Sequence, residues 1–131
     1  MANTPLRFLI VDDHAPARIA LREMVAAQPG WHVIDEATNG LEAISSAITN
    51  RPDVVLMDVA MPKLNGLQTA RKIKANFPQV KIILFSAYAD RGYSHGSKEA
   101  GADFFVQKEE LTAQALCKIV TQVLSNGLSA N

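Results

Sequence analysis

The stretch that decides the fold is VVLMDVAMPKLNG, which covers residues 54–66. Its first four residues are apolar and do not alternate with polar ones, the pattern of a strand that helices cover on both faces of a parallel sheet. Asp58 follows the apolar run at once, and Pro62, Asn65 and Gly66 then indicate a loop. We therefore predict a buried strand that ends on an acidic residue at the edge of a sheet.

The same unit recurs on both sides of this stretch, because four more short apolar runs are each followed by residues with helical spacing. The predicted strands lie at residues 8–11, 33–34, 54–57, 82–85 and 104–106. The clearest predicted helices lie at residues 16–28, 40–49, 66–76 and 112–125, with Gly127 as the C-cap of the last. Five such units predict an α/β fold with a five-stranded, doubly wound parallel sheet in a single domain.

The fourth helix is the weakest prediction. Its segment, RGYSHGSKEAG at residues 91–101, contains Gly92 and Gly96, and each glycine costs about 1 kcal/mol against alanine inside a helix. We expect this helix to be short, frayed or mobile. We also expect the tail at residues 128–131 to be frayed.

Composition narrows the class of protein. The 48% hydrophobic and 20% charged residues among 131 are those of one ordinary globular domain, not of a disordered chain. Thirteen basic residues balance thirteen acidic ones, so no overall charge favours direct binding of nucleic acid or of a membrane surface. Because the sequence has neither a signal peptide nor a long apolar run, we expect a cytoplasmic protein.

The predicted strand ends carry the chemistry. In doubly wound sheets, sites lie at the carboxyl ends of the strands, where this sequence has Asp12-Asp13, Asp58, Ser86 and Lys108. Three carboxylates in one crevice repel one another, by about 1 kcal/mol per pair at 4 Å even in water. A cation must compensate, and a set of oxygen ligands suits Mg²⁺ rather than zinc.

Each of these residues taken alone has an ordinary structural interpretation. Acids at strand ends are commonly turn formers or helix caps, a lone serine is a turn residue, and a lone lysine is a solvent-facing charge. The combination of five such groups at four strand ends is what favours a site.

Four stretches together resemble the receiver domain of two-component response regulators over essentially the whole chain, residues 1–131. They are FLIVDDH at residues 8–14, VVLMDVAMPKLNG at 54–66, FSA at 85–87 and GADFFVQK at 101–108. The resemblance implies a flavodoxin-like sheet with strand order 2-1-3-4-5. It also implies a signalling switch rather than an enzyme that acts on a separate substrate.

The same resemblance implies a role for each site residue. Asp58 would accept a phosphoryl group from a histidine kinase, a phosphotransfer protein or a small phosphodonor such as acetyl phosphate. Mg²⁺ would be held by Asp13, Asp58 and the backbone carbonyl of Ala60, with Asp12 acting through water. The remaining implied roles are hydrogen bonding to the phosphoryl group by Ser86, charge pairing with it by Lys108, and filling of the space that Ser86 vacates by Phe105.

Some positions depart from the commonest pattern of the family. Glu109 stands where many members have proline, Phe105 replaces a frequent tyrosine and Phe104 a frequent glycine. The DDH opening and the missing proline resemble receivers that precede a LuxR-type helix-turn-helix domain. The implied partners are therefore such an output domain, a separate downstream target, or a second copy in a phosphorylation-dependent homodimer.

Three other classes of protein could share parts of this pattern. A haloacid dehalogenase-type hydrolase needs a second acid two residues after its nucleophile, where this sequence has Ala60. A flavodoxin-like redox domain needs a phosphate-binding loop after the first strand, and Asp12 and Asp13 would repel a phosphate there. A binding module that does not use phosphorylation is not excluded by the residues alone. The resemblance to receiver domains also implies that Ala60 and Tyr88 border the path of the attacking water, and we therefore expect slow self-dephosphorylation.

Overall fold

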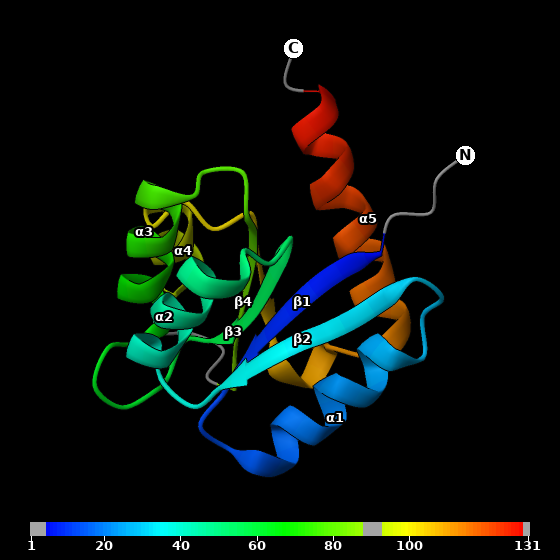
Figure 1. Ribbon diagram of the computed structural model, residues 1–131, viewed down its shortest axis with the longest axis horizontal. Coiled ribbons are helices and arrows are strands. Elements are labelled where there is room, and N and C mark those ends of the chain that lie inside the picture. Colours follow the sequence, from blue (N-terminus) through cyan, green and yellow to red (C-terminus); the bar gives the residue numbers. More distant parts are fainter. Residues whose placement is uncertain (1–4, 88–92, 130–131) are drawn as a thin grey trace.

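The computed structural model describes residues 5–87 and 93–129. It contains five parallel strands with helices on both faces, in the order β2-β1-β3-β4-β5 (Figure 1). The predicted doubly wound α/β fold and its strand order are therefore confirmed. The elements are β1 (Leu6–Val11), α1 (Ala15–Ala26), β2 (Trp31–Ala37), α2 (Gly40–Asn50), β3 (Val54–Asp58), α3 (Gly66–Asn76), β4 (Lys81–Ser86), α4 (Tyr93–Glu99), β5 (Phe104–Gln107), a 3₁₀ turn (Lys108–Glu110) and α5 (Ala113–Ser129).

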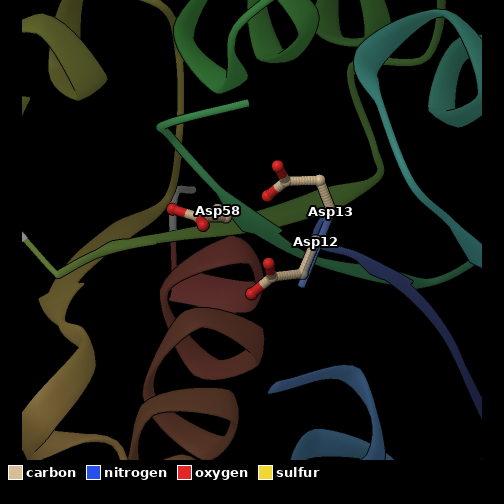
Figure 2. A group of neighbouring side chains, drawn as sticks. All are labelled: Asp12, Asp13 and Asp58. Atoms are coloured by element: carbon tan, nitrogen blue, oxygen red, sulfur yellow. The ribbon is translucent and has the colours of Figure 1, made fainter. Parts of the chain in front are cut away.

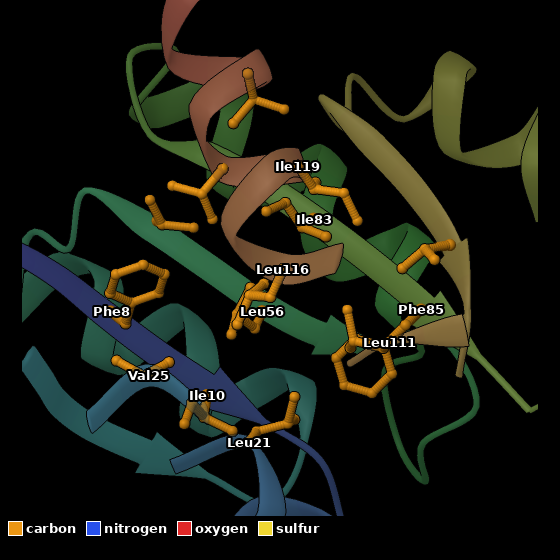
Figure 3. Close-up of a cluster of buried hydrophobic side chains, with 14 residues drawn as sticks. Phe8, Ile10, Leu21, Val25, Leu56, Ile83, Phe85, Leu111, Leu116 and Ile119 are labelled. Atoms are coloured by element: carbon orange, nitrogen blue, oxygen red, sulfur yellow. The ribbon is translucent and has the colours of Figure 1, made fainter. Parts of the chain in front are cut away.

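Two hydrophobic cores lie on the two faces of the sheet, because successive strand residues point to opposite sides. Phe8 and Ile10 of β1 pack toward α1 and α5, in the cluster that Figure 3 shows. Leu9 and Val11 pack in the other cluster, beneath α2 and α3. Burial of each side chain of this size contributes about 1.5–3 kcal/mol to the stability of the fold. The sheet therefore holds the loops at its carboxyl edge in fixed positions.

Side-chain hydrogen bonds cap the N-termini of α2 and α3, two helices near the carboxyl edge of the sheet. The side chain of Asn39 accepts a hydrogen bond from the backbone of Glu42 at the start of α2. Asn65 and Gln68 form a capping box at the start of α3. These caps fix where the loops after β2 and β3 end.

Two predicted boundaries are wrong. α5 does not stop near Ser125 with Gly127 as its C-cap, because the helix runs through Gly127 to Ser129. Val120 and Val123 anchor it on the core, and packing of this kind outweighs the modest helix penalty of one glycine. Of the predicted tail, 128 and 129 therefore belong to the helix, and 130–131 lie outside the described residues.

The second strand was predicted too short, as residues 33–34 only. β2 runs from Trp31 to Ala37 at the edge of the sheet, where charged residues such as Asp35 and Glu36 can reach solvent.

The fourth helix is short, as expected, with seven residues. Gly92 and Tyr88 lie outside the described residues. Within the described part of the chain, no helix has both the length and the apolar character needed to cross a membrane.

Candidate functional site

Strand register brings the three acids together. Val11 of β1 pairs with Met57 of β3, so the next residues along the two strands, Asp12 and Asp58, come side by side. Carboxylate oxygens of Asp12, Asp13 and Asp58 all lie within 4.8 Å of one another (Figure 2). Asp12 is fully buried and Asp58 is 6% exposed, whereas Asp13 is exposed. The acidic cluster expected from the strand ends is therefore present.

The loop after Asp58 folds back tightly on it. The backbone N–H of Gly66 donates to the carbonyl oxygen of Val59 at 2.9 Å. A Cβ atom on Gly66 would lie 2.5 Å from the carbonyl oxygen of Asp58 and 2.8 Å from Cα of Val59, so only glycine fits there. Inside this loop, the backbone N–H of Ala60 donates to Oδ1 of Asp58 at 3.2 Å.

Lys108 reaches the acidic cluster from the end of β5, which is the edge strand beyond β4, at the point where the 3₁₀ turn begins. Its Nζ lies 2.9 Å from Oδ2 of Asp12 and 3.5 Å from Oδ2 of Asp58. The sequence predicted Lys108 as a fixed positive charge at the acidic edge that would pair with an incoming phosphoryl group. In the structure the shorter contact is with Asp12, which sequence reasoning missed.

The two carboxylates and the ammonium shift one another's protonation. Burial raises the pKa of Asp58, and the negative charge of Asp12 raises it further, against the opposing effect of Lys108. Burial by itself would lower the pKa of Lys108, but its close contact with the Asp12 carboxylate and the charge of Asp58 together raise it. The site is therefore short of positive charge, with one ammonium facing a cluster of three acids.

This charge balance fits a divalent cation. Oδ2 of Asp12 is buried and accepts no hydrogen bond of good geometry within the described residues, although the Lys108 ammonium lies close to it. Its other oxygen, Oδ1, accepts from the backbone N–H of His14 at 2.9 Å. Carboxylate oxygens are the donors that Mg²⁺ prefers. The residues present therefore suit the expected ion.

Ser86 and Phe105 lie at the other end of the same edge. Ser86 is the last residue of β4 and is fully buried. Phe105 pairs in register with Leu84 of β4 and is half-buried against the α2 and α3 side of the sheet. Because strand residues alternate, Ser86 and Leu84 project to the same face. Ser86 and Phe105 thus belong to one face, which is also the face that α4 covers (Figure 1).

The fold and the site together define a doubly wound α/β protein with a cluster of three acids at the carboxyl edge of its sheet. A family model described as the response regulator receiver domain matches residues 8–121. The chain therefore belongs to the response regulator receiver family. The sequence resemblance is confirmed, and with it a place in two-component signalling.

Curated relatives extend beyond the matched region. The chain is 31% identical over 122 residues to the transcriptional regulatory protein DegU of Brevibacillus brevis, covering 93% of this chain and 51% of that protein. It is 44% identical over 111 residues to a protein-glutamate methylesterase/protein-glutamine glutaminase of Methanosarcina acetivorans, covering 80% of this chain and 30% of that protein. The chain thus spans about half the length of the first relative and less of the second.

Solved structures agree with this assignment. A LuxR-family two-component response regulator from Aurantimonas matches with a TM-score of 0.86 and 27% identity, over 94% of this chain and 87% of that one. A CheX-CheY-BeF₃-Mg²⁺ complex from Borrelia burgdorferi matches with a TM-score of 0.85 and 26% identity, over 92% of this chain and 90% of that one.

Proposed function

We propose that this receiver domain is switched by phosphorylation of Asp58, with Mg²⁺ as its cofactor. The observation that carries the proposal is the position of the Asp58 carboxylate, within 4.8 Å of Asp12 and Asp13 and 3.5 Å from the Lys108 ammonium. In this family such a constellation accepts a phosphoryl group, and the structurally similar CheX-CheY-BeF₃-Mg²⁺ complex supports that use.

The reaction needs little covalent chemistry from the protein. A carboxylate oxygen of Asp58 attacks phosphorus, the bond from phosphorus to the donor breaks, and its electron pair leaves with the donor's imidazole or acetate. Phosphoryl transfer depends mainly on alignment and on neutralised charge. The closed loop at Gly66 holds Asp58 in place, and Lys108 supplies one of the positive charges.

The metal ligands that we propose are those that the family resemblance implies. Asp13, Asp58 and the backbone carbonyl of Ala60 would hold Mg²⁺, and Asp12 would act through water, and the closeness of the three carboxylates supports this set. When bound, the ion supplies positive charge that offsets the carboxylates and the phosphoryl oxygens. Lys108 is free to turn from Asp12 toward the new charge on Asp58, because the two contacts lie on neighbouring oxygens.

The readout uses Ser86 and Phe105. We infer that Ser86 hydrogen-bonds the phosphoryl group and that Phe105 moves into the space that Ser86 leaves. Their common face of the sheet and the partial exposure of Phe105 support this coupling, since a half-buried ring has room to become more buried.

The partners come from the longer relatives and from the family. We propose a histidine kinase or a phosphotransfer protein as donor, in the cytoplasm. The output would be a helix-turn-helix domain, a separate target or a phosphorylation-dependent homodimer, and not direct nucleic acid or membrane binding by this domain. The relative DegU is a transcriptional regulatory protein, which favours control of transcription. The chemistry of the domain would be confined to its own Asp58, so we do not propose an enzyme.

The test is intact-protein mass spectrometry after incubation with acetyl phosphate. The parent should gain the mass of one phosphoryl group with Mg²⁺ and none with a chelator. Asp58→Asn should gain none, whereas Asp35→Asn, which removes a carboxylate from the edge strand β2, should gain the same mass as the parent. Labelling of Asp58→Asn would contradict the proposal. The lifetime of the phosphoryl label in Mg²⁺ tests the expected slow self-dephosphorylation. Ala60→Asn introduces a side chain that can hold the attacking water, so the label should last a shorter time in this variant than in the parent.

A further inference from the structure

Arg18 of α1 makes contacts that the proposed chemistry does not explain. Its Nη1 donates to the backbone carbonyl oxygen of Asp12 at 2.7 Å, and its Nε lies 3.4 Å from Oε1 of Glu36 on β2. The side chain is only 19% exposed. A long cationic side chain is thus drawn in against the loop that carries two of the three acids.

The Asp12 carbonyl needs a partner because the sheet ends there. The backbone N–H of Asp12 still bonds to the carbonyl oxygen of Ala37 on β2 at 3.1 Å. Beyond this bond the chain leaves the sheet and enters α1 at Ala15. Arg18 therefore supplies the hydrogen bond that a neighbouring strand would otherwise have supplied.

Asp13 depends on this backbone more than its neighbours do. Asp12 is held by burial, by Lys108 and by the His14 N–H. Asp13 is exposed, and its carboxylate forms no hydrogen bond or ion pair within residues 5–87 and 93–129. Asp13 is therefore linked to the rest of the site through its backbone, and the carbonyl of the peptide that joins it to Asp12 is the one that accepts from Arg18.

We propose that Arg18 is a positioning residue for the metal site: it fixes the Asp12–Asp13 peptide so that the Asp13 carboxylate stays turned toward Asp58. Glu36 holds the guanidinium in place through Nε. This inference rests on the proposed Mg²⁺ site. Arg18 touches neither the metal nor the phosphoryl group, and acts through the backbone between two acids.

Charge alone predicts the opposite effect, which makes the proposal testable. A positive side chain near a cation site repels the cation, so its removal would strengthen Mg²⁺ binding. Loss of positioning would weaken binding instead. Arg22 provides the matched control, because it also pairs with Glu36, at 3.4 Å, yet is 49% exposed and has no bond to Asp12.

The experiment measures Mg²⁺ affinity by calorimetry, or by amide NMR shifts at residues 12–14, in Arg18→Met and Arg22→Met. We expect about tenfold weaker binding in Arg18→Met, as for other groups that orient metal ligands, and little change in Arg22→Met. Arg18→Lys keeps the charge but not the forked geometry, and should lie between the parent and Arg18→Met. Thermal unfolding with a chelator establishes that each variant is folded.

Each result has one meaning. Parent protein that does not bind Mg²⁺ would refute the proposed function itself. Parent protein that binds Mg²⁺, with Arg18→Met binding as tightly or more tightly, would refute the positioning role alone. If Arg18→Met does not fold, Arg18→Lys decides, and parental affinity in that variant would overturn the inference.

Discussion

The two ends of the carboxyl edge are built differently. At the β1 and β3 end, Asp12 is fixed by three partners and the loop after Asp58 is closed by a backbone contact that only Gly66 permits. At the β4 and β5 end, α4 has only seven residues and contains Gly96. Phe105 there is half-buried. We conclude that the proposed chemistry has one fixed geometry, whereas the proposed readout has room for two.

Gly66 and Gly96 show this difference in the space that surrounds each of them. A Cβ atom on Gly66 would meet backbone atoms of Asp58 and Val59, which cannot move without moving the site. A Cβ atom on Gly96 would lie 3.0 Å from Cδ1 of Leu67, which is the end of a flexible side chain. Substitution of glycine by alanine should therefore destabilise the protein at Gly66 and stabilise it at Gly96.

The largest effect is expected for Gly66→Ala. The added methyl group overlaps backbone atoms, so the loop after Asp58 must shift, and we expect about 3 kcal/mol of destabilisation, the upper range for overpacking. Denaturant unfolding measures the loss, and Mg²⁺ affinity should fall as well. A variant of parental stability and affinity would show that this end is less fixed than we infer.

Lys108→Met should come next. It leaves the fully buried Asp12 without its close cation, and unpaired buried charges are strongly destabilising. Because Lys108 is 28% exposed, we expect a reduced loss of about 2 kcal/mol in chelator. Millimolar Mg²⁺ should restore part of the stability. Equal losses with and without Mg²⁺ would contradict the charge balance that we describe.

Asp58→Asn should stabilise the protein in the absence of metal, by about 1 kcal/mol, the size of one partly screened like-charge contact. Burial and Asp12 raise the pKa of Asp58, so the folded state holds this proton more tightly than the unfolded state does. The parent consequently loses stability as the pH rises from the ordinary carboxyl pKa through the raised one.

The gain from Asp58→Asn should thus be largest at neutral pH and vanish as the pH falls below the ordinary carboxyl pKa. Urea unfolding of the two proteins across this range, in chelator, measures it. Glu23→Gln, at an exposed carboxylate on α1, is the control and should show no such trend. A gain that is independent of pH would rule out charge as its cause.

The smallest effect is expected for Gly96→Ala. Alanine favours a helix by about 1 kcal/mol over glycine, and adjustment of Leu67 offsets part of this, which leaves about 0.5 kcal/mol of stabilisation. If α4 takes part in the readout, the phosphorylation-induced NMR shifts of α4 should also become smaller. Destabilisation as large as that of Gly66→Ala would remove the contrast between the two ends.

The sequence predicted the parts of the molecule that are set by local pattern. Continuous apolar runs such as residues 54–57 identify buried strands, and parallel strands place Asp12, Asp58 and Ser86 at one edge. Edge strand β2 was underestimated because its outer residues are polar and charged. The end of α5 was misplaced because packing on the core carried the helix past Gly127.

The contacts that hold the site could not be predicted in the same way. The pairing of Lys108 with Asp12 and the bond from Arg18 to the Asp12 carbonyl depend on side chains that reach across elements distant in sequence. No periodicity or spacing encodes such contacts. Gly66 was predicted as the residue at which a loop ends and a helix begins, and its close approach to the Asp58 backbone appears only in the structure.

The most direct test of the central claim is to locate the phosphoryl group in the unmodified sequence. Borohydride reduces an aspartyl phosphate to homoserine, which peptide mass spectrometry can place at a single residue. After treatment with acetyl phosphate and Mg²⁺, we expect homoserine at position 58, and neither at Asp12 nor at Asp13. Homoserine at another acid, or none in protein that has gained phosphoryl mass, would contradict the assignment of Asp58 as the acceptor.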